Sequence, residues 1–137
     1  MLDEYQWIEN WLNSHPELVD QFSGIFEYKK THNCMFAFSR LADEFQMPFL
    51  ERYADEYRKA FSEGKVDESL FWPDELAQLK LICDEPEKFL QSYRSGKEYA
   101  AALESATQHG KLALFRFYTS HEGLNSAIKR TLKFLSK

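Results

Sequence analysis

Apolar residues recur at three- and four-residue intervals along most of the chain, the spacing that places side chains on one face of an α-helix. The clearest case begins at Pro48 and is closed by Gly64, with aromatic residues and alanines on one face and all charged residues on the other. Proline suits the first turn of a helix because its missing N–H has no intrahelical partner there, and glycine suits the position after the last turn. The pattern therefore predicts a helix over 48–64 with one buried face.

The same spacing, with its caps and turn residues, predicts further helices. They are expected over 2–14, from Pro16 to between Gly24 and Tyr28, from 31–33 to Phe45, over 73–83, over 86–95, over 97–109, and over 120–137, where Leu124, Ile128, Leu132 and Leu135 form the stripe. Strands near 25–39 and 111–119 are the alternative, although the first pattern runs beyond the usual strand length. We therefore predict an all-α bundle of about seven or eight helices, with a small α+β fold as the alternative.

Length and composition narrow the class of protein. A chain of 137 residues is expected to form a single globular helical domain over 1–137, and 44% hydrophobic with 16% aromatic residues argue against disorder. The N-terminus lacks a basic region followed by an apolar one, and no apolar run is long enough to cross a bilayer. The expected protein is cytoplasmic, without membrane contact, and Cys34 and Cys83 are expected to be reduced and buried.

Charge is distributed very unevenly along the chain. The net charge is −5, but residues 43–87 hold 13 acidic and 5 basic residues, whereas residues 88–137 hold 3 acidic and 9 basic residues. These segments carry −8 and +6 respectively. An uneven charge distribution of this kind influences how fast partners are attracted and which partners bind, rather than the fold.

Aromatic residues and carboxylates are interleaved in the acidic segment. A tryptophan inside a charged rim is typical of an interface hot spot, although Trp72 could instead pack inward before its helix. The predicted partner-binding residues are Asp67, Glu68, Phe71, Trp72, Asp74 and Glu75, together with Glu51 and Asp55. The predicted function is a non-catalytic acidic binding protein that neutralises a basic protein partner, such as a bacterial immunity protein or antitoxin blocking a nuclease toxin. The oligomeric state stays open.

Candidate catalytic and metal-binding patterns are weak. No two histidines stand at the spacing of ligands on one helical face, and the five glycines are scattered singly, so neither a metal site nor a phosphate-binding loop is predicted, and no cofactor is expected. A small hydrolase or transferase is the alternative function. Its site would be assembled from distant residues: Cys34, His109, His121 and Glu122.

Nucleic-acid binding through the basic C-terminal helix is a further alternative, that of a regulatory helical protein. The basic residues are Arg116, Lys129, Arg130, Lys133 and Lys137, with Phe117 and Tyr118 nearby. The overall acidity of the chain disfavours phosphate binding, so nucleic acid is not the expected partner.

Overall fold

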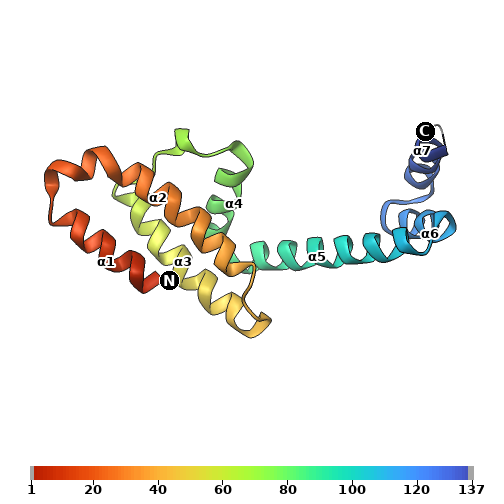
Figure 1. The fold of residues 1–137 in the computed structure, drawn as a ribbon, viewed down its shortest axis with the longest axis horizontal. Coiled ribbons are helices and arrows are strands. Elements are labelled where there is room, and N and C mark those ends of the chain that lie inside the picture. The colour runs from red at the N-terminus through yellow and green to blue at the C-terminus, as the bar shows by residue number, and fades with distance from the viewer. Residues whose placement is uncertain (1, 136–137) are drawn as a thin grey trace. The chain divides into compact units, whose positions relative to one another are not determined.

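The computed structural model describes residues 2–135, and in this range every regular element is helical (Figure 1). The prediction of an all-α fold with about seven or eight helices is confirmed, and both stretches that could have been strands are helical. The elements are α1 (Leu2–Asn13), α2 (Pro16–Phe38), α3 (Asp43–Ser62), the 3₁₀ helix η1 (Glu68–Leu70), α4 (Pro73–Asp84), α5 (Pro86–Gln108), α6 (Lys111–Glu122) and α7 (Leu124–Leu135).

The chain divides into two compact units, here called the N-terminal unit (Met1–Gln91) and the C-terminal unit (Ser92–Lys137). The boundary falls within α5. It nearly coincides with the change in charge: the N-terminal unit holds 19 acidic and 9 basic residues, and the C-terminal unit holds 3 acidic and 8 basic residues. The single-domain expectation stays a prediction, which comparison of unfolding probes can test.

Aromatic side chains dominate the core of the N-terminal unit, where α1 packs on α2 and α3 packs on α4. Tyr53 and Tyr57 on α3 are fully buried, with ring centroids 4.6 Å apart. Phe38 at the end of α2 meets Phe89 in the first turn of α5 at 5.9 Å. Burial of such rings is the largest favourable contribution expected for a unit of this size.

Helix α2 corrects two predicted boundaries. It runs without interruption through Gly24, near which it was predicted to end. This glycine allows a close approach, because a Cβ built there would lie only 2.9 Å from the Cβ of Asp67. It also stops at Phe38 rather than continuing to Phe45, since residues 39–42 turn the chain and Ala42 is extended. Phe45, predicted to share a buried line with Phe38, is instead 59% exposed.

Helix α3 begins at Asp43, five residues before the predicted start at Pro48. Asp43 and Glu44 occupy the first turn, where negative charge is favourable at the helix N-terminus. Proline near this end removes only one hydrogen bond, to the carbonyl of an exposed residue, so the helix tolerates it. The predicted end is confirmed, because Gly64 adopts a φ of 68° and the Lys65 N–H bonds to the carbonyl of Ala60, closing the last turn.

The C-terminal unit contains most of α5 and the pair α6 and α7. Helix α5 continues through the predicted stop at Ser95–Gly96. The cost of one glycine is small, and strong helix formers follow it. Phe117 and Ala127 are buried, and Phe117 packs 5.1 Å from the ring of Tyr99. The predicted α7 stripe does not form a core within the described residues: Leu124, Ile128 and Leu132 are 42–62% exposed, and the Leu135 side chain lies outside the described part.

Candidate functional site

Phe71 and Trp72, the two aromatic residues of the predicted partner-binding surface, point in opposite directions. Both have extended backbone, in which successive side chains face opposite sides. Phe71 is 7% exposed and packs edge-on against Tyr28 of α2, with ring centroids 5.2 Å apart. Trp72 is 69% exposed. Phe71 therefore anchors the segment to the core, and Trp72 is the side chain available to a partner.

Two of the four carboxylates around these rings cap the local structure. Asp67 caps η1, because its Oδ1 accepts hydrogen bonds from the backbone N–H and the hydroxyl of Ser69 at 3.0 and 2.6 Å. Glu75 accepts the Trp72 backbone N–H at 3.0 Å through Oε2 and meets the His32 ring at 3.0 Å through Oε1.

The third carboxylate, Glu68, forms an ion pair with Lys80 at 3.0 Å, with both side chains about half exposed. Such an exposed pair is weak and easily exchanged. Asp74 is exposed in the first turn of α4. Glu68 and Asp74 are therefore the charges of this group that a partner can engage without dismantling a cap.

The remaining predicted residues, Glu51 and Asp55, belong to α3 and are exposed. Asp55 pairs with Arg58 at 2.6 Å. Glu51 lines a shallow hollow of about 380 Å³ together with Met47 of α3 and with the segment that joins the C-terminal end of α4 to α5: Asp84, Glu85, Pro86, Glu87 and Lys88. Trp72 precedes the opposite end of α4. The α4 axis spans ~18 Å at 1.5 Å per residue, so the predicted residues form two acidic areas rather than one.

A buried charge network in the N-terminal unit was missed by the sequence analysis. Lys30 is 2% exposed, and its Nζ lies 2.8 Å from Glu56 Oε2 and 4.0 Å from Glu9 Oε2. Lys65 reaches the other oxygen of Glu9 at 3.4 Å. The sequence does contain a sign of this network, because Glu27 and Lys30 lie on the same helical face as the buried Cys34 and Phe38. Their positions, however, do not indicate which distant residues would pair with them.

Glu27, in the same network, is 2% exposed, and its Oε2 has no hydrogen-bond partner among the described residues. Burial raises the pKa of its carboxyl to about 7, against a lowering effect of Lys30 and a raising effect of Glu9. Lys30 compensates only in part because it is already paired with Glu56. Neutral Glu27 is therefore the form that folding favours.

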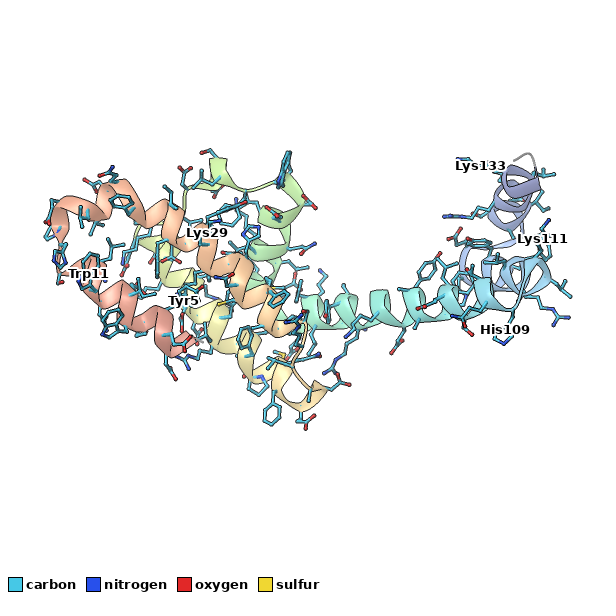
Figure 2. The ribbon with its side chains drawn as sticks, in the orientation of Figure 1. Tyr5, Trp11, Lys29, His109, Lys111 and Lys133 are labelled. Carbon is cyan, nitrogen blue, oxygen red and sulfur yellow. The ribbon has the colours of Figure 1, made fainter. Side chains whose placement is uncertain are left out.

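The alternative catalytic residues fall in both units. Cys34 is fully buried in the N-terminal unit, where burial raises its thiol pKa to about 12, whereas a nucleophilic cysteine needs an accessible thiolate. His109 lies at the end of α5 near Lys111, with its Nδ1 2.7 Å from the carbonyl of Ser105 (Figure 2).

His121 and Glu122 are adjacent on α6, yet they contact different groups. His121 stacks on Phe117 and lies 2.9 Å from its backbone carbonyl. Glu122 accepts hydrogen bonds from Tyr99 at 2.5 Å and from Arg130 at 2.7 Å, and the Tyr99 hydroxyl is the main reason its carboxyl pKa is lowered. Glu122 therefore serves as a local bridge between α5, α6 and α7.

The basic residues of the C-terminal unit are partly engaged. Arg130 pairs with Glu122 and covers the Tyr118 ring at 5.0 Å, and Phe117 is buried and not available for stacking. Arg116 and Lys129 are exposed. Lys133 lies on α7 (Figure 2), and Lys137 lies outside the described residues.

Comparisons of the chain with models of protein families, with curated proteins and with solved structures gave no match. None of the helices in residues 2–135 has the length and apolar composition required to cross a membrane. Within the same residues, no group of three or more histidine, cysteine, aspartate or glutamate side chains is arranged to hold a metal ion.

Proposed function

We propose that this protein is a non-catalytic binding protein whose acidic N-terminal unit recognises a basic protein partner. The observation that carries the proposal is the exposure of Trp72 on a unit with a net charge of −10. A tryptophan that is 69% exposed keeps most of its apolar area in contact with water, and removing that area from water against a partner would favour binding. Attraction by the surrounding carboxylates would speed the encounter.

The contacts in this region determine which variants are suitable for the test. Asp67 and Glu75 are unsuitable because their neutralisation also removes a cap. Trp72→Ala, Glu68→Gln and Asp74→Asn change the exposed groups only. Glu104→Gln on α5 is the matched control, because it removes one exposed negative charge from the C-terminal unit.

The experiment is a capture from the native host lysate at low salt, followed by affinity measurement with the purified partner at several salt concentrations. We expect a basic partner whose affinity falls as salt rises and falls at least tenfold with Trp72→Ala, with smaller losses for Glu68→Gln and Asp74→Asn. Glu104→Gln should bind like the wild type. A partner held equally by the Trp72→Ala variant, or without salt dependence, would refute the proposal.

The specific form of this proposal is an immunity protein or antitoxin that covers the cationic active site of a nuclease toxin. The net negative charge of the N-terminal unit supports this more specific form. Stoichiometric inhibition of a captured nuclease by the wild type, but not by Trp72→Ala, is the expected result. A captured basic partner without nuclease activity would leave the binding function standing and remove its toxin-inhibitor form.

Nucleic-acid binding by the C-terminal unit is a second candidate, favoured by its net charge of +5 and by the exposed Arg116 and Lys129. Retention of the full chain on heparin at moderate salt, lost in an Arg116→Gln/Lys129→Gln double variant, would support it. Elution with the unbound fraction would remove it.

A further inference from the structure

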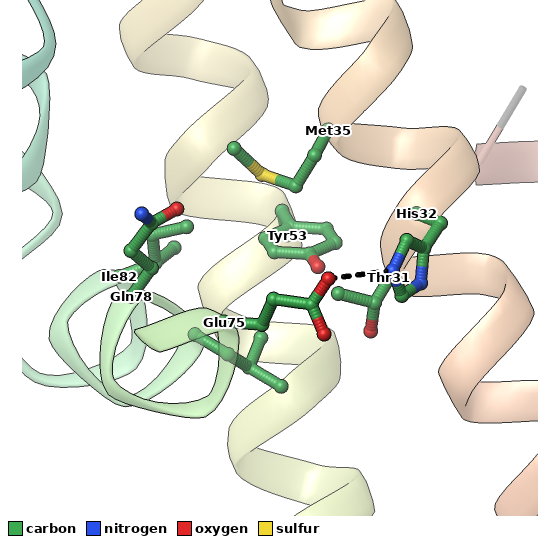
Figure 3. Close-up of a pocket in the computed structure, with 8 residues that line it drawn as sticks. Thr31, His32, Met35, Tyr53, Glu75, Gln78 and Ile82 are labelled. Atoms are coloured by element: carbon green, nitrogen blue, oxygen red, sulfur yellow. Dashed lines mark hydrogen bonds and ion pairs between the residues drawn. The ribbon is translucent and has the colours of Figure 1, made fainter. Parts of the chain in front are cut away.

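A pocket of about 160 Å³ opens between α2, α3 and α4 of the N-terminal unit (Figure 3). Its walls are largely apolar, formed by Met35 of α2 with Leu79 and Ile82 of α4. Leu79 and Ile82 are each 1% exposed, so this side belongs to the rigid core. The pocket is distinct from the exposed Trp72 side chain, although Glu75 contributes to the surroundings of both.

The hydroxyl of Tyr53 lies in the wall of this pocket without a hydrogen-bond partner among the described residues. Tyr53 is fully buried, and burial raises its pKa, so the group stays protonated and can donate. The nearby hydroxyls of Thr31 and Tyr57 counter part of this rise. They bond to each other and to the backbone carbonyl of Glu27, at 2.9 Å from Thr31 and 2.7 Å from Tyr57. A buried donor without a partner is rare and destabilising, which points to a missing acceptor.

His32 and Glu75 form the partly exposed side of the pocket, where Figure 3 shows their contact. The His32 Nδ1 lies 2.9 Å from the carbonyl of Tyr28, and its Nε2 lies 3.0 Å from Glu75 Oε1. The two ring nitrogens thus lie against a backbone carbonyl and a carboxylate. The polar groups on this side of the pocket are therefore already paired with each other.

We propose that this pocket binds a small uncharged alcohol or phenol. The apolar body of the ligand would lie between Met35, Leu79 and Ile82, and its oxygen would accept a hydrogen bond from the Tyr53 hydroxyl. An apolar cavity of ~150 Å³ accommodates benzene, so the volume here suits a molecule of roughly six to eight non-hydrogen atoms. The Met35 thioether makes favourable contacts with an aromatic ring. A carboxylate oxygen of Glu75 can accept a hydrogen bond from the ligand's own hydroxyl, which selects against hydrocarbons of equal size.

The test uses the full chain with phenol and toluene as probes, which have similar size and differ in the hydroxyl. Binding is followed by NMR at the methyl groups of Leu79 and Ile82 during titration. We expect saturable phenol binding with a dissociation constant on the order of 1 mM, as suits a ligand of this size. Toluene should bind more weakly.

Two variants separate recognition from folding. Tyr53→Phe removes only the hydroxyl, and should weaken phenol binding about fivefold to tenfold while changing toluene binding less than about twofold. It should also raise the melting temperature of the ligand-free protein, because the donor without a partner is gone. Met35→Phe, at a half-buried position, should fill the pocket and abolish binding of both probes.

Three results would overturn the proposal. The first is the absence of saturable shifts for either compound, which would show that the pocket holds only water. The second is an equal loss of phenol and toluene binding on Tyr53→Phe. The third is a lowered melting temperature of the ligand-free Tyr53→Phe protein, which would show that the hydroxyl already has a partner. None of these results bears on the binding of a basic protein through Trp72, so the two proposals fail independently.

Discussion

The buried carboxyl of Glu27 predicts that the N-terminal unit loses stability as the pH rises. Its pKa is raised from 4.5 to about 7, so between these values the folded state binds its proton more tightly than the unfolded state. The stabilisation is complete below pH 4.5 and is lost as the pH rises through 7. At 1.36 kcal/mol per pKa unit, the shift from 4.5 to about 7 corresponds to about 3 kcal/mol of unfolding free energy.

The Glu27→Gln variant isolates this contribution, because an amide keeps the shape and cannot ionise. The groups facing Glu27 are Lys30, Glu9, Lys65 and Glu56, and they remain in the variant. We expect its stability to change less than that of the wild type between pH 5 and 8, so that the variant gains about 2 to 3 kcal/mol relative to the wild type across this range.

Urea unfolding at several pH values, followed by tryptophan fluorescence, measures this difference. All three tryptophans, Trp7, Trp11 and Trp72, belong to the N-terminal unit, so the signal reports that unit. Glu51→Gln is the matched control, because it removes an exposed carboxyl of α3 and should follow the wild type. The reasoning is refuted if Glu27→Gln keeps the wild-type pH dependence.

Three further predictions concern the glycines, the units and the thiols. Gly96→Ala should stabilise α5 by about 0.5–1 kcal/mol. Gly24→Ala should destabilise the protein by about 1–3 kcal/mol, because the added Cβ meets Asp67. The free energy of unfolding in urea measures both effects, and equal values for the two variants would contradict the close approach at Gly24. The two units should unfold separately, so that circular dichroism shows a helical transition that tryptophan fluorescence does not follow; coincident curves would instead confirm a single domain. Cys34 and Cys83, whose pKa values burial raises to about 12 and about 11, should resist a thiol reagent at pH 8 until the protein is unfolded; stoichiometric labelling of the native protein would exclude this burial.

The sequence predicted the helical class well because amphipathic periodicity is a local property. The stripe of Tyr53, Tyr57 and Ala60 on α3 is buried as its spacing indicates. Boundaries were less predictable, because local rules for breakers compete with the surroundings. Pro48 and Gly96 both lie inside helices, since neither disturbs a buried hydrogen bond or contact strongly enough to end one.

The candidate site depends more on contacts between distant residues. Composition located the acidic segment, but the opposite fates of Phe71 and Trp72 follow from packing against Tyr28, more than forty positions earlier. The pocket needs Tyr53, His32 and Glu75 from three helices, and no spacing along the chain brings them together. Sequence alone therefore indicated a charged surface and could not indicate the cavity beside it.

The pairing of buried Lys30 with Glu56 has a consequence for how related chains could diverge. Replacing Glu56 alone would leave the buried Lys30 charge with only the more distant Glu9 carboxylate at 4.0 Å, and breaking a buried pair in this way typically destabilises by about 3–5 kcal/mol. Replacing both by apolar residues of similar volume is often neutral. In an alignment of homologous chains, positions 30 and 56 should therefore covary, with position 9 following them, while neighbouring exposed positions drift independently.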